Sequence, residues 1–293
     1  MQHEKIAIIG VGRLGMSLAI ACREAGLDVG ALYDIRTQAA KVCAGFLGET
    51  IVCKTISDIP GDITLIFLTI PDDHVAQAVE ELRNAQVLRV ESLVVHTSGN
   101  LSSSVLDPLK KYTHFLASLH PVQTFSGASE DWKRLFGITF SFDGHPESLP
   151  RLKELLKKLN GSLIEIEPQH KALYHLACAL ASNYLVGIEY MAIDILQNIG
   201  LNQDQAIKLL QPLVKATLEN ISHNGPVRAL TGPISRGDVG TVCKHVQAME
   251  MTHPEYLPIY RSLGKLLIEL TRKKNSGSNR LDKIEMILNE IKV

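Results

Sequence analysis

Three glycines near the start of the chain, Gly10, Gly12 and Gly15, have a spacing that can do chemistry. In such a series the first glycine permits a tight turn, the second lets a phosphate approach the backbone, and the third lets the next helix pack closely. The N-terminus of that helix adds free N–H groups and a partial positive charge. The pattern therefore predicts a loop that holds the pyrophosphate of a dinucleotide, with Arg13 and Leu14 as further contacts. The alternative is a plain glycine turn.

A carboxylate follows this loop at the spacing of a ribose ligand. Asp34 ends the second apolar segment, about 20 residues after the glycines, where an acidic residue binds the ribose hydroxyls of NAD. Arg36 and Thr37 come directly afterwards and could instead hold the 2′-phosphate of NADP. Thr69 and Pro71, at the end of a strand expected beside the loop, complete the predicted cofactor contacts. These residues leave NAD and NADP open.

Two further strands end in polar residues. Ligands of an open parallel sheet bind beyond the carboxyl ends of its strands, so we expect Ser98 and His120 to face the nicotinamide end of the same cleft. Hydride transfer at a carbonyl, hydroxyl or imine carbon needs a proton partner, and histidine suits this role. His120 is therefore the predicted acid/base, with a structural histidine as the alternative. Ser98 is predicted to bind a polar group of the substrate or the nicotinamide carboxamide, or else to be a turn or cap residue, and His96 is expected to be buried.

The second half of the chain contains a long apolar segment at 169–197 that is compatible with a helix throughout, with Gly200 as its C-cap. His175 and Asn183 lie on one broad face of this helix among small residues, which favours a substrate-facing stripe. The alternative is a polar helix–helix contact. Lys171, near the helix start, is expected to be solvated.

Two glycines and a proline shape the segment 231–238, which precedes another helix. Arg236 could bind a substrate carboxylate through two parallel hydrogen bonds, or else form a structural ion pair. Thr231 is a second predicted substrate contact, and Asp238 is the expected N-cap of the following helix.

The elements that must position these residues change in type halfway along the chain. Strands are expected at 5–10, 28–33, 63–70, 93–96, 115–119, 138–142 and 162–167, and helices at 14–25 and 74–82, the latter capped by Asp72 or Asp73. This alternation predicts an α/β fold, a doubly wound Rossmann parallel sheet. Helices at 203–223, 237–252, 255–273 and 281–291 predict an all-α domain after it. The expected domains are 1–167 and 168–293.

The amino-acid composition argues against several classes of partner and site. The chain has 30 lysines and arginines against 31 aspartates and glutamates, a formal net charge of -1, which argues against a nucleic-acid partner. The five cysteines are widely spaced, so we expect neither a metal site nor disulfides. No signal peptide is apparent, and no apolar run approaches the roughly 20 residues that span a bilayer. We therefore expect a cytoplasmic protein with no membrane partner.

Several motifs together resemble a known family. They are His96-Thr97-Ser98-Gly99, Leu119-His120-Pro121-Val122-Gln123, Tyr174-His175 through Asn183-Tyr184, and Thr231-Gly232-Pro233 through Arg236-Gly237-Asp238. With them the chain resembles the Rossmann-like oxidoreductases whose helical half is a domain of unknown function, in the 6-phosphogluconate dehydrogenase-like superfamily. The resemblance covers nearly the whole chain. It implies a C-terminal domain of the 6-phosphogluconate dehydrogenase type, a nicotinamide cofactor with a preference for NADP, and a homodimer formed through the helical domain.

Relatives within that superfamily imply two different proton donors. Prephenate dehydrogenases have a similar His-Pro pair whose histidine engages the reacting hydroxyl, which supports His120. Ketopantoate reductases and hydroxyacid dehydrogenases use a lysine on the first long helix and an asparagine one turn later. Here Lys171 or His175 occupies that region, and Ala179 stands where the asparagine would be.

These observations predict an NAD(P)-dependent dehydrogenase or reductase that acts on a small, carboxylated metabolite. His120 would be the acid/base, His175 and Asn183 would orient the substrate, and Arg236 would pair with its anionic group. A ketopantoate-reductase-like enzyme and a non-catalytic dinucleotide-binding sensor or scaffold are the alternatives.

Overall fold

The computed structural model describes residues 4–274 and 279–289. Two compact units make up the chain, Met1–Ser182 and Asn183–Val293. The first unit thus continues past the expected domain boundary at residue 167 and includes one further helix.

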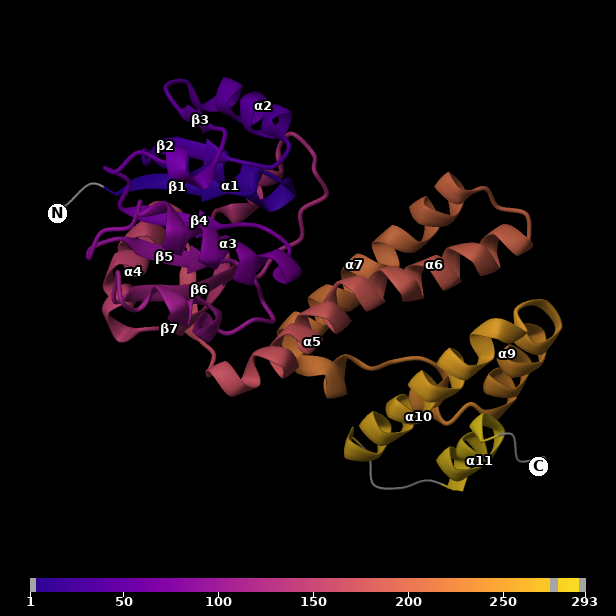
Figure 1. Ribbon diagram of the computed structural model, residues 1–293. Coiled ribbons are helices and arrows are strands. Elements are labelled where there is room, and N and C mark those ends of the chain that lie inside the picture. Colours follow the sequence, from indigo (N-terminus) through magenta and orange to yellow (C-terminus); the bar gives the residue numbers. More distant parts are fainter. Residues whose placement is uncertain (1–3, 275–278, 290–293) are drawn as a thin grey trace. The chain divides into compact units, whose positions relative to one another are not determined.

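The first unit contains an eight-stranded sheet in the order β3-β2-β1-β4-β5-β6-β7-β8 (Figure 1). Its strands are β1 Lys5–Ile9, β2 Asp28–Tyr33, β3 Ile51–Cys53, β4 Leu65–Leu68, β5 Leu93–His96, β6 Phe115–Pro121, β7 Thr139–Gly144 and β8 Ser162–Glu165. Its α-helices are α1 Arg13–Glu24, α2 Thr37–Leu47, α3 Asp72–Ala85, α4 Leu149–Lys158 and α5 Lys171–Ala181. Short 3-10 helices lie at η1 Ile56–Asp58, η2 Ser103–Leu109, η3 Asp131–Leu135, η4 Pro146–Ser148 and η5 Pro168–His170.

Helices cover both faces of this sheet, because the central strands are apolar on both sides. In β1, Ile6 and Ile8 belong to one hydrophobic core, while Ala7 and Ile9 belong to the core on the opposite face. Successive side chains of a strand point to opposite faces, so a continuous apolar run must be buried twice. The expected doubly wound architecture is confirmed.

Three local details differ from the sequence expectations. The edge strand β3 is too short to give a pattern of its own, and β7 pairs antiparallel to β6, so the sheet is mostly rather than wholly parallel. Helix α3 begins at Asp72, with Pro71 as its N-cap, so neither Asp72 nor Asp73 caps it.

The helix expected over 169–197 is two helices, α5 and α6 (Asn183–Asn198). Ser182 interrupts them with a non-helical backbone, φ -122° and ψ -71°. Over residues 4–274 and 279–289, one stretch, Pro168–Asn198, is long and apolar enough to cross a membrane by length and composition alone. This corrects the expectation that no such stretch exists. However, Lys171 near its start is buried and bonded to the sheet.

The second unit is helical. After α6 it contains α7 Gln203–Ala229, α8 Pro233–Arg236, α9 Val239–Thr252, η6 Pro254–Tyr256, α10 Leu257–Lys274 and α11 Asn279–Leu288. Gly200 follows α6 with φ +99°, as its expected capping role requires. Asp238 accepts a hydrogen bond from the Thr241 amide at 3.1 Å, which confirms it as the N-cap of α9. Gly225 kinks α7, with φ +72°.

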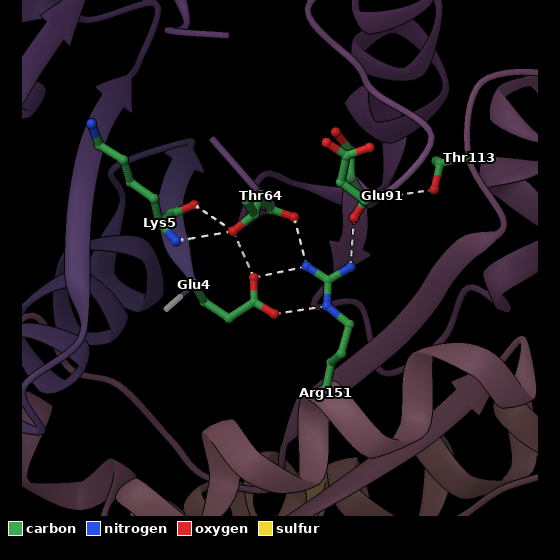
Figure 2. A network of polar contacts seen from close by, with 7 residues as sticks. Glu4, Lys5, Thr64, Glu91, Thr113 and Arg151 are labelled. Carbon is green, nitrogen blue, oxygen red and sulfur yellow. Dashed lines mark hydrogen bonds and ion pairs between the residues drawn. The ribbon is translucent and has the colours of Figure 1, made fainter. Parts of the chain in front are cut away.

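An ion pair joins the amino ends of the central strands to α4 (Figure 2). Arg151 donates to both carboxylate oxygens of Glu4, each at 2.7 Å, and to the carbonyl oxygens of Thr64 and Glu91. The Thr64 hydroxyl donates to Glu4 as well, at 2.6 Å. These bonds lower the pKa of the Glu4 carboxyl although burial opposes them. The network fixes the end of the sheet away from the glycine loop.

Candidate functional site

The glycine loop has the geometry that its spacing predicts. Gly10 has φ +93°, and a Cβ there would lie 2.4 Å from Ile70. A Cβ on Gly15 would lie 2.0 Å from the Gly10 carbonyl oxygen, so α1 approaches the loop as closely as only glycine allows. By contrast, a Cβ on Gly12 would meet nothing within 4 Å, which leaves open space above the backbone. The first intrahelical bond runs from the Met16 amide to the Gly12 carbonyl, so the amides of the first turn are available for an anion.

Asp34 braces this loop from inside the protein. Its Oδ2 accepts the Val11 amide at 2.7 Å, and its Oδ1 accepts the Arg36 amide at 2.7 Å and the Arg36 Nε at 3.4 Å. The residue is only 6% exposed, whereas the Arg36 side chain is 70% exposed. Asp34 therefore ties β2 to the glycine loop, and Arg36 is the more accessible charge at this position.

A cleft of about 880 Å³ opens above the carboxyl ends of the strands. The predicted cofactor residues that line it are Gly10, Gly12, Arg13, Leu14, Asp34, Arg36, Thr69 and Pro71. Gly15 lies behind them as a packing residue, and the Thr69 hydroxyl donates to the Gly10 carbonyl. Ser98, Gly99 and His120 line the same cleft, so the loop and the predicted acid/base face one space. The residues present fit a dinucleotide, since an open backbone approach and a helix N-terminus adjoin the cleft.

One face of the sheet carries a row of polar residues beside this cleft, all of them buried except for the half-buried His120. His96 in β5 pairs with Ser118 in β6, which pairs with Asp143 in β7, while His120 pairs with Ser141. Residues in register on neighbouring strands share a face, as do residues two apart on one strand. The five side chains therefore lie together on one face of the sheet.

Lys171 lies against this row, and it is only 1% exposed. Its Nζ donates to the Ser118 Oγ at 2.9 Å and to the Ser98 carbonyl oxygen at 3.4 Å. Burial lowers the pKa of Lys171, while Asp143 and Asp72 raise it. The expectation that this lysine is solvated is wrong, because the start of α5 packs on the polar face of the sheet.

His120 lies between the cleft and Tyr174. Its Nδ1 is 2.7 Å from the Tyr174 hydroxyl, and the two rings pack edge to face with centroids 5.7 Å apart. On the other side of the ring, Nε2 lies 3.0 Å from the place where a Cβ of Gly99 would be. That place is also 2.9 Å from a ring carbon of His175, so a side chain at position 99 would displace both histidines.

The surroundings of His120 keep it neutral at pH 7. Burial, the Lys171 ammonium and His175 lower its pKa to about 4, and Asp72 only partly opposes them. Burial raises the pKa of Tyr174 to about 12. Both partners of this hydrogen bond are therefore uncharged at pH 7.

Two other predicted residues of the first unit have defined surroundings. The Ser98 hydroxyl accepts the amides of Asn100 and Leu101, at 3.1 and 2.9 Å, so it acts as a turn residue as well as lining the cleft. His96 is fully buried, as expected, with its Nε2 3.1 Å from the Ser102 carbonyl oxygen. His175 is exposed on α5, with its ring centroid 6.4 Å from that of His120.

The remaining predicted site residues belong to the second unit. Asn183 begins α6, and Thr231 and Arg236 flank and end α8. Their roles as substrate contacts stay predictions.

Sequence reasoning missed Tyr174, Ser118 and Asp143, and it misjudged the surroundings of Lys171. A signal for the polar row was present, because Ser118 and His120 alternate with buried Leu119. Such alternation in a strand predicted to be buried on both faces indicates that one face meets polar partners. Lys171 and Tyr174, three residues apart on a helix, then become candidate partners.

The fold and cleft define a Rossmann-type protein with a helical C-terminal region. Residues 2–121 match the model of a Rossmann-like domain, and residues 138–267 match DUF2520, a domain of unknown function. The chain thus combines a Rossmann-like domain with a DUF2520 domain, which is the pairing of domains that its motifs resemble.

Solved structures share this fold over nearly the whole chain. TM1727 from Thermotoga maritima is 24% identical, with 92% of this chain and 99% of that chain covered and a TM-score of 0.71. BF3122 from Bacteroides fragilis is 21% identical, covers 91% and 98%, and has a TM-score of 0.73. Pyrroline carboxylate reductase from Plasmodium falciparum, solved with NADP bound, is 12% identical, covers 97% and 99%, and has a TM-score of 0.59. A comparison with curated proteins gives no match.

Replacing Lys171 by Met tests the electrostatic part of this description. A nearby cation disfavours a second positive charge, so its removal should raise the pKa of His120 from about 4 toward, but not up to, 6.5, because the ring stays buried. Titration of the histidine ring by NMR measures this shift. Lys153→Met, at an exposed position of α4, should leave it unchanged. An unaltered pKa in Lys171→Met would contradict the charge coupling.

Proposed function

We propose that this protein is an NAD(P)-dependent oxidoreductase that transfers a hydride to or from a small, carboxylated metabolite. One observation carries the proposal: the glycine loop and His120 line the same cleft of about 880 Å³. A bound nicotinamide would supply or accept the hydride there. The chain's own groups would bind the dinucleotide, orient the substrate and exchange the proton that accompanies the hydride.

The loop would hold the pyrophosphate through the amides at the start of α1, and the open space above Gly12 supports this. NADP is the preferred cofactor in this proposal. Both oxygens of Asp34 already accept protein N–H groups, whereas Arg36 is exposed and can pair with a 2′-phosphate. The NADP bound by the Plasmodium falciparum relative agrees with this preference.

His120 would exchange a proton with the substrate. A neutral imidazole can donate a hydrogen bond to a carbonyl oxygen or accept one from a hydroxyl, and a lowered pKa keeps it neutral. Ser98 and His175 would bind and orient the substrate together with Asn183 and Thr231. Arg236 would pair with the carboxylate.

The alternatives have weaker support. A ketopantoate-reductase-like mechanism requires a lysine at the reacting centre, but the Lys171 ammonium is bonded to Ser118 and does not line the cleft. A sensor or scaffold would need no group that exchanges protons beside the bound cofactor. The pairing of His120, which lines the cleft, with Tyr174 behind it favours an enzyme.

Replacing His120 by Asn tests the proposed reaction. Asparagine keeps a polar side chain but cannot exchange a proton near neutral pH, so turnover should fall by roughly 100-fold or more. The assay follows NADPH oxidation with a panel of 2-oxo acids and cyclic imines, while NADPH fluorescence measures cofactor binding, which should be retained. If the variant reduces these compounds as fast as the unaltered protein, the role of His120 is refuted.

Replacing Arg36 by Ala tests the cofactor preference. Removal of a guanidinium that pairs with the 2′-phosphate should weaken NADPH binding by about 10-fold or more and leave NADH binding nearly unchanged. Titrations of both cofactors give the two dissociation constants, with Arg23→Ala on the far end of α1 as the matched control. An equal loss for both cofactors would contradict a 2′-phosphate contact.

We also propose a cytoplasmic homodimer. Leu173, Leu176 and Leu180 lie on one exposed face of α5 and leave 68%, 48% and 52% of their surfaces uncovered. A second copy of the chain would bury such a face. Light scattering of the purified protein should give twice the mass of one chain, and Leu176→Lys should shift it toward the monomer. A monomeric mass at micromolar concentration would overturn the dimer.

We propose no nucleic-acid partner. The numbers of acidic and basic residues nearly balance, and this supports the proposal because a nucleic-acid binder needs an excess of basic residues.

A further inference from the structure

The two nitrogens of His120 face different surroundings. Nε2 is on the side of Gly99, at the wall of the cleft, and Nδ1 is 2.7 Å from the Tyr174 hydroxyl. His120 thus connects a reacting substrate with a phenol that does not itself line the cleft.

The chemistry of the two groups determines which of them donates. A phenol is a stronger hydrogen-bond donor than an imidazole N–H, and an imidazole nitrogen is a stronger acceptor than a phenol oxygen. The Tyr174 hydroxyl therefore donates to Nδ1, and the ring proton of neutral His120 resides on Nε2. This arrangement presents an N–H donor to the cleft.

We propose that Tyr174 is a positioning residue that acts through His120: it fixes the Nε2–H tautomer and replaces the proton that His120 gives to the substrate. This inference rests on the proposed oxidoreductase function. It assigns the group that returns a proton to His120 to a side chain outside the cleft.

The proton transfer balances in the direction of carbonyl reduction. As a hydride from the nicotinamide reaches the carbonyl carbon, the substrate oxygen takes the Nε2 proton of His120, and Nδ1 takes the phenolic proton of Tyr174. The electron pair of the broken O–H bond stays on the tyrosine oxygen, and the imidazole remains neutral. A proton from water then restores the phenol.

The charged groups around the pair favour this route over an imidazolium donor. Lys171 and His175 oppose a positive charge on His120, and Asp72 is the acidic group that favours one. Burial raises the pKa of Tyr174 to about 12 and so opposes a negative charge on the phenol, but the Lys171 Nζ lies 5.8 Å from the centroid of its ring, and this positive charge favours a transient negative one there. A buried cation thus disfavours the charged form of the histidine and assists the charged form of the tyrosine.

NMR of protein labelled with ¹⁵N-histidine tests the tautomer without any substrate. The His120 signals are assigned by their absence from His120→Asn. The unaltered protein should show His120 as the Nε2–H tautomer at pH 7, with Nδ1 hydrogen-bonded. In Tyr174→Phe the Nδ1 signal should move toward that of a free imidazole nitrogen, while Tyr112→Phe, at an exposed position, should change nothing. An Nδ1–H tautomer in the unaltered protein, or an unchanged spectrum in Tyr174→Phe, overturns the inference.

Kinetics separate this inference from the proposed function. With the 2-oxo acid and imine panel, Tyr174→Phe should lower kcat by about 10-fold, leave the KM for NADPH unchanged and reduce the solvent isotope effect, because one of two moving protons is lost. If His120→Asn abolishes turnover but Tyr174→Phe retains kcat and the isotope effect, only the role of Tyr174 fails. If both variants retain full turnover, the proton-exchanging role of His120 fails and the proton relay fails with it. If the unaltered protein oxidises NADPH with none of the panel, the proposed function fails, while the tautomer measured by NMR still decides whether Tyr174 positions the ring.

Discussion

A buried ammonium group organises the end of the sheet that adjoins the cleft. On burial, the Lys171 ammonium loses its hydrogen bonds to water and gains one to a serine hydroxyl and one to a carbonyl oxygen. Burial of a charge in this way costs free energy unless an opposite charge lies nearby. Asp143 supplies that charge from the neighbouring strand, and its carboxylate is itself held by the amide and hydroxyl of Ser103. The start of α5, the end of β6 and the segment after β5 are therefore held in place together.

The burial of Lys171 also determines which residues of α5 lie against which residues of β6. Lys171 contacts Ser118, and three residues later Tyr174 contacts His120, two residues further along β6. Three helical residues advance about 4.5 Å and two strand residues about 6.6 Å, distances that long side chains can reconcile. The helix thus follows the strand at its beginning, and the histidine receives both its hydrogen-bond partner and its electrostatic environment from a single turn.

The sequence predicts well whatever depends on local pattern. The glycine loop, the strands 28–33 and 93–96 and the cap at Asp238 follow from spacing and residue type, and all are present. The direction of β7 depends on its pairing with another strand, so no single window of sequence reveals it. Lys171 is the clearest case. A lysine near a helix start is normally solvated, and only the polar row on the sheet makes its burial tolerable.

The boundary between the two units at Ser182 indicates where the chain can be divided into fragments. A cut at residue 167 would separate His120 from Lys171 and Tyr174, and the imidazole would lose an ammonium that lowers its pKa and its hydrogen-bond partner. A cut after Ser182 would leave all three on one polypeptide. For anyone who exchanges helical domains between relatives, the transplantable part is therefore the Rossmann sheet together with the first helix that follows it. The proposed proton chemistry would remain with the Rossmann piece, and the exchanged piece would bring only the substrate contacts proposed for Asn183, Thr231 and Arg236.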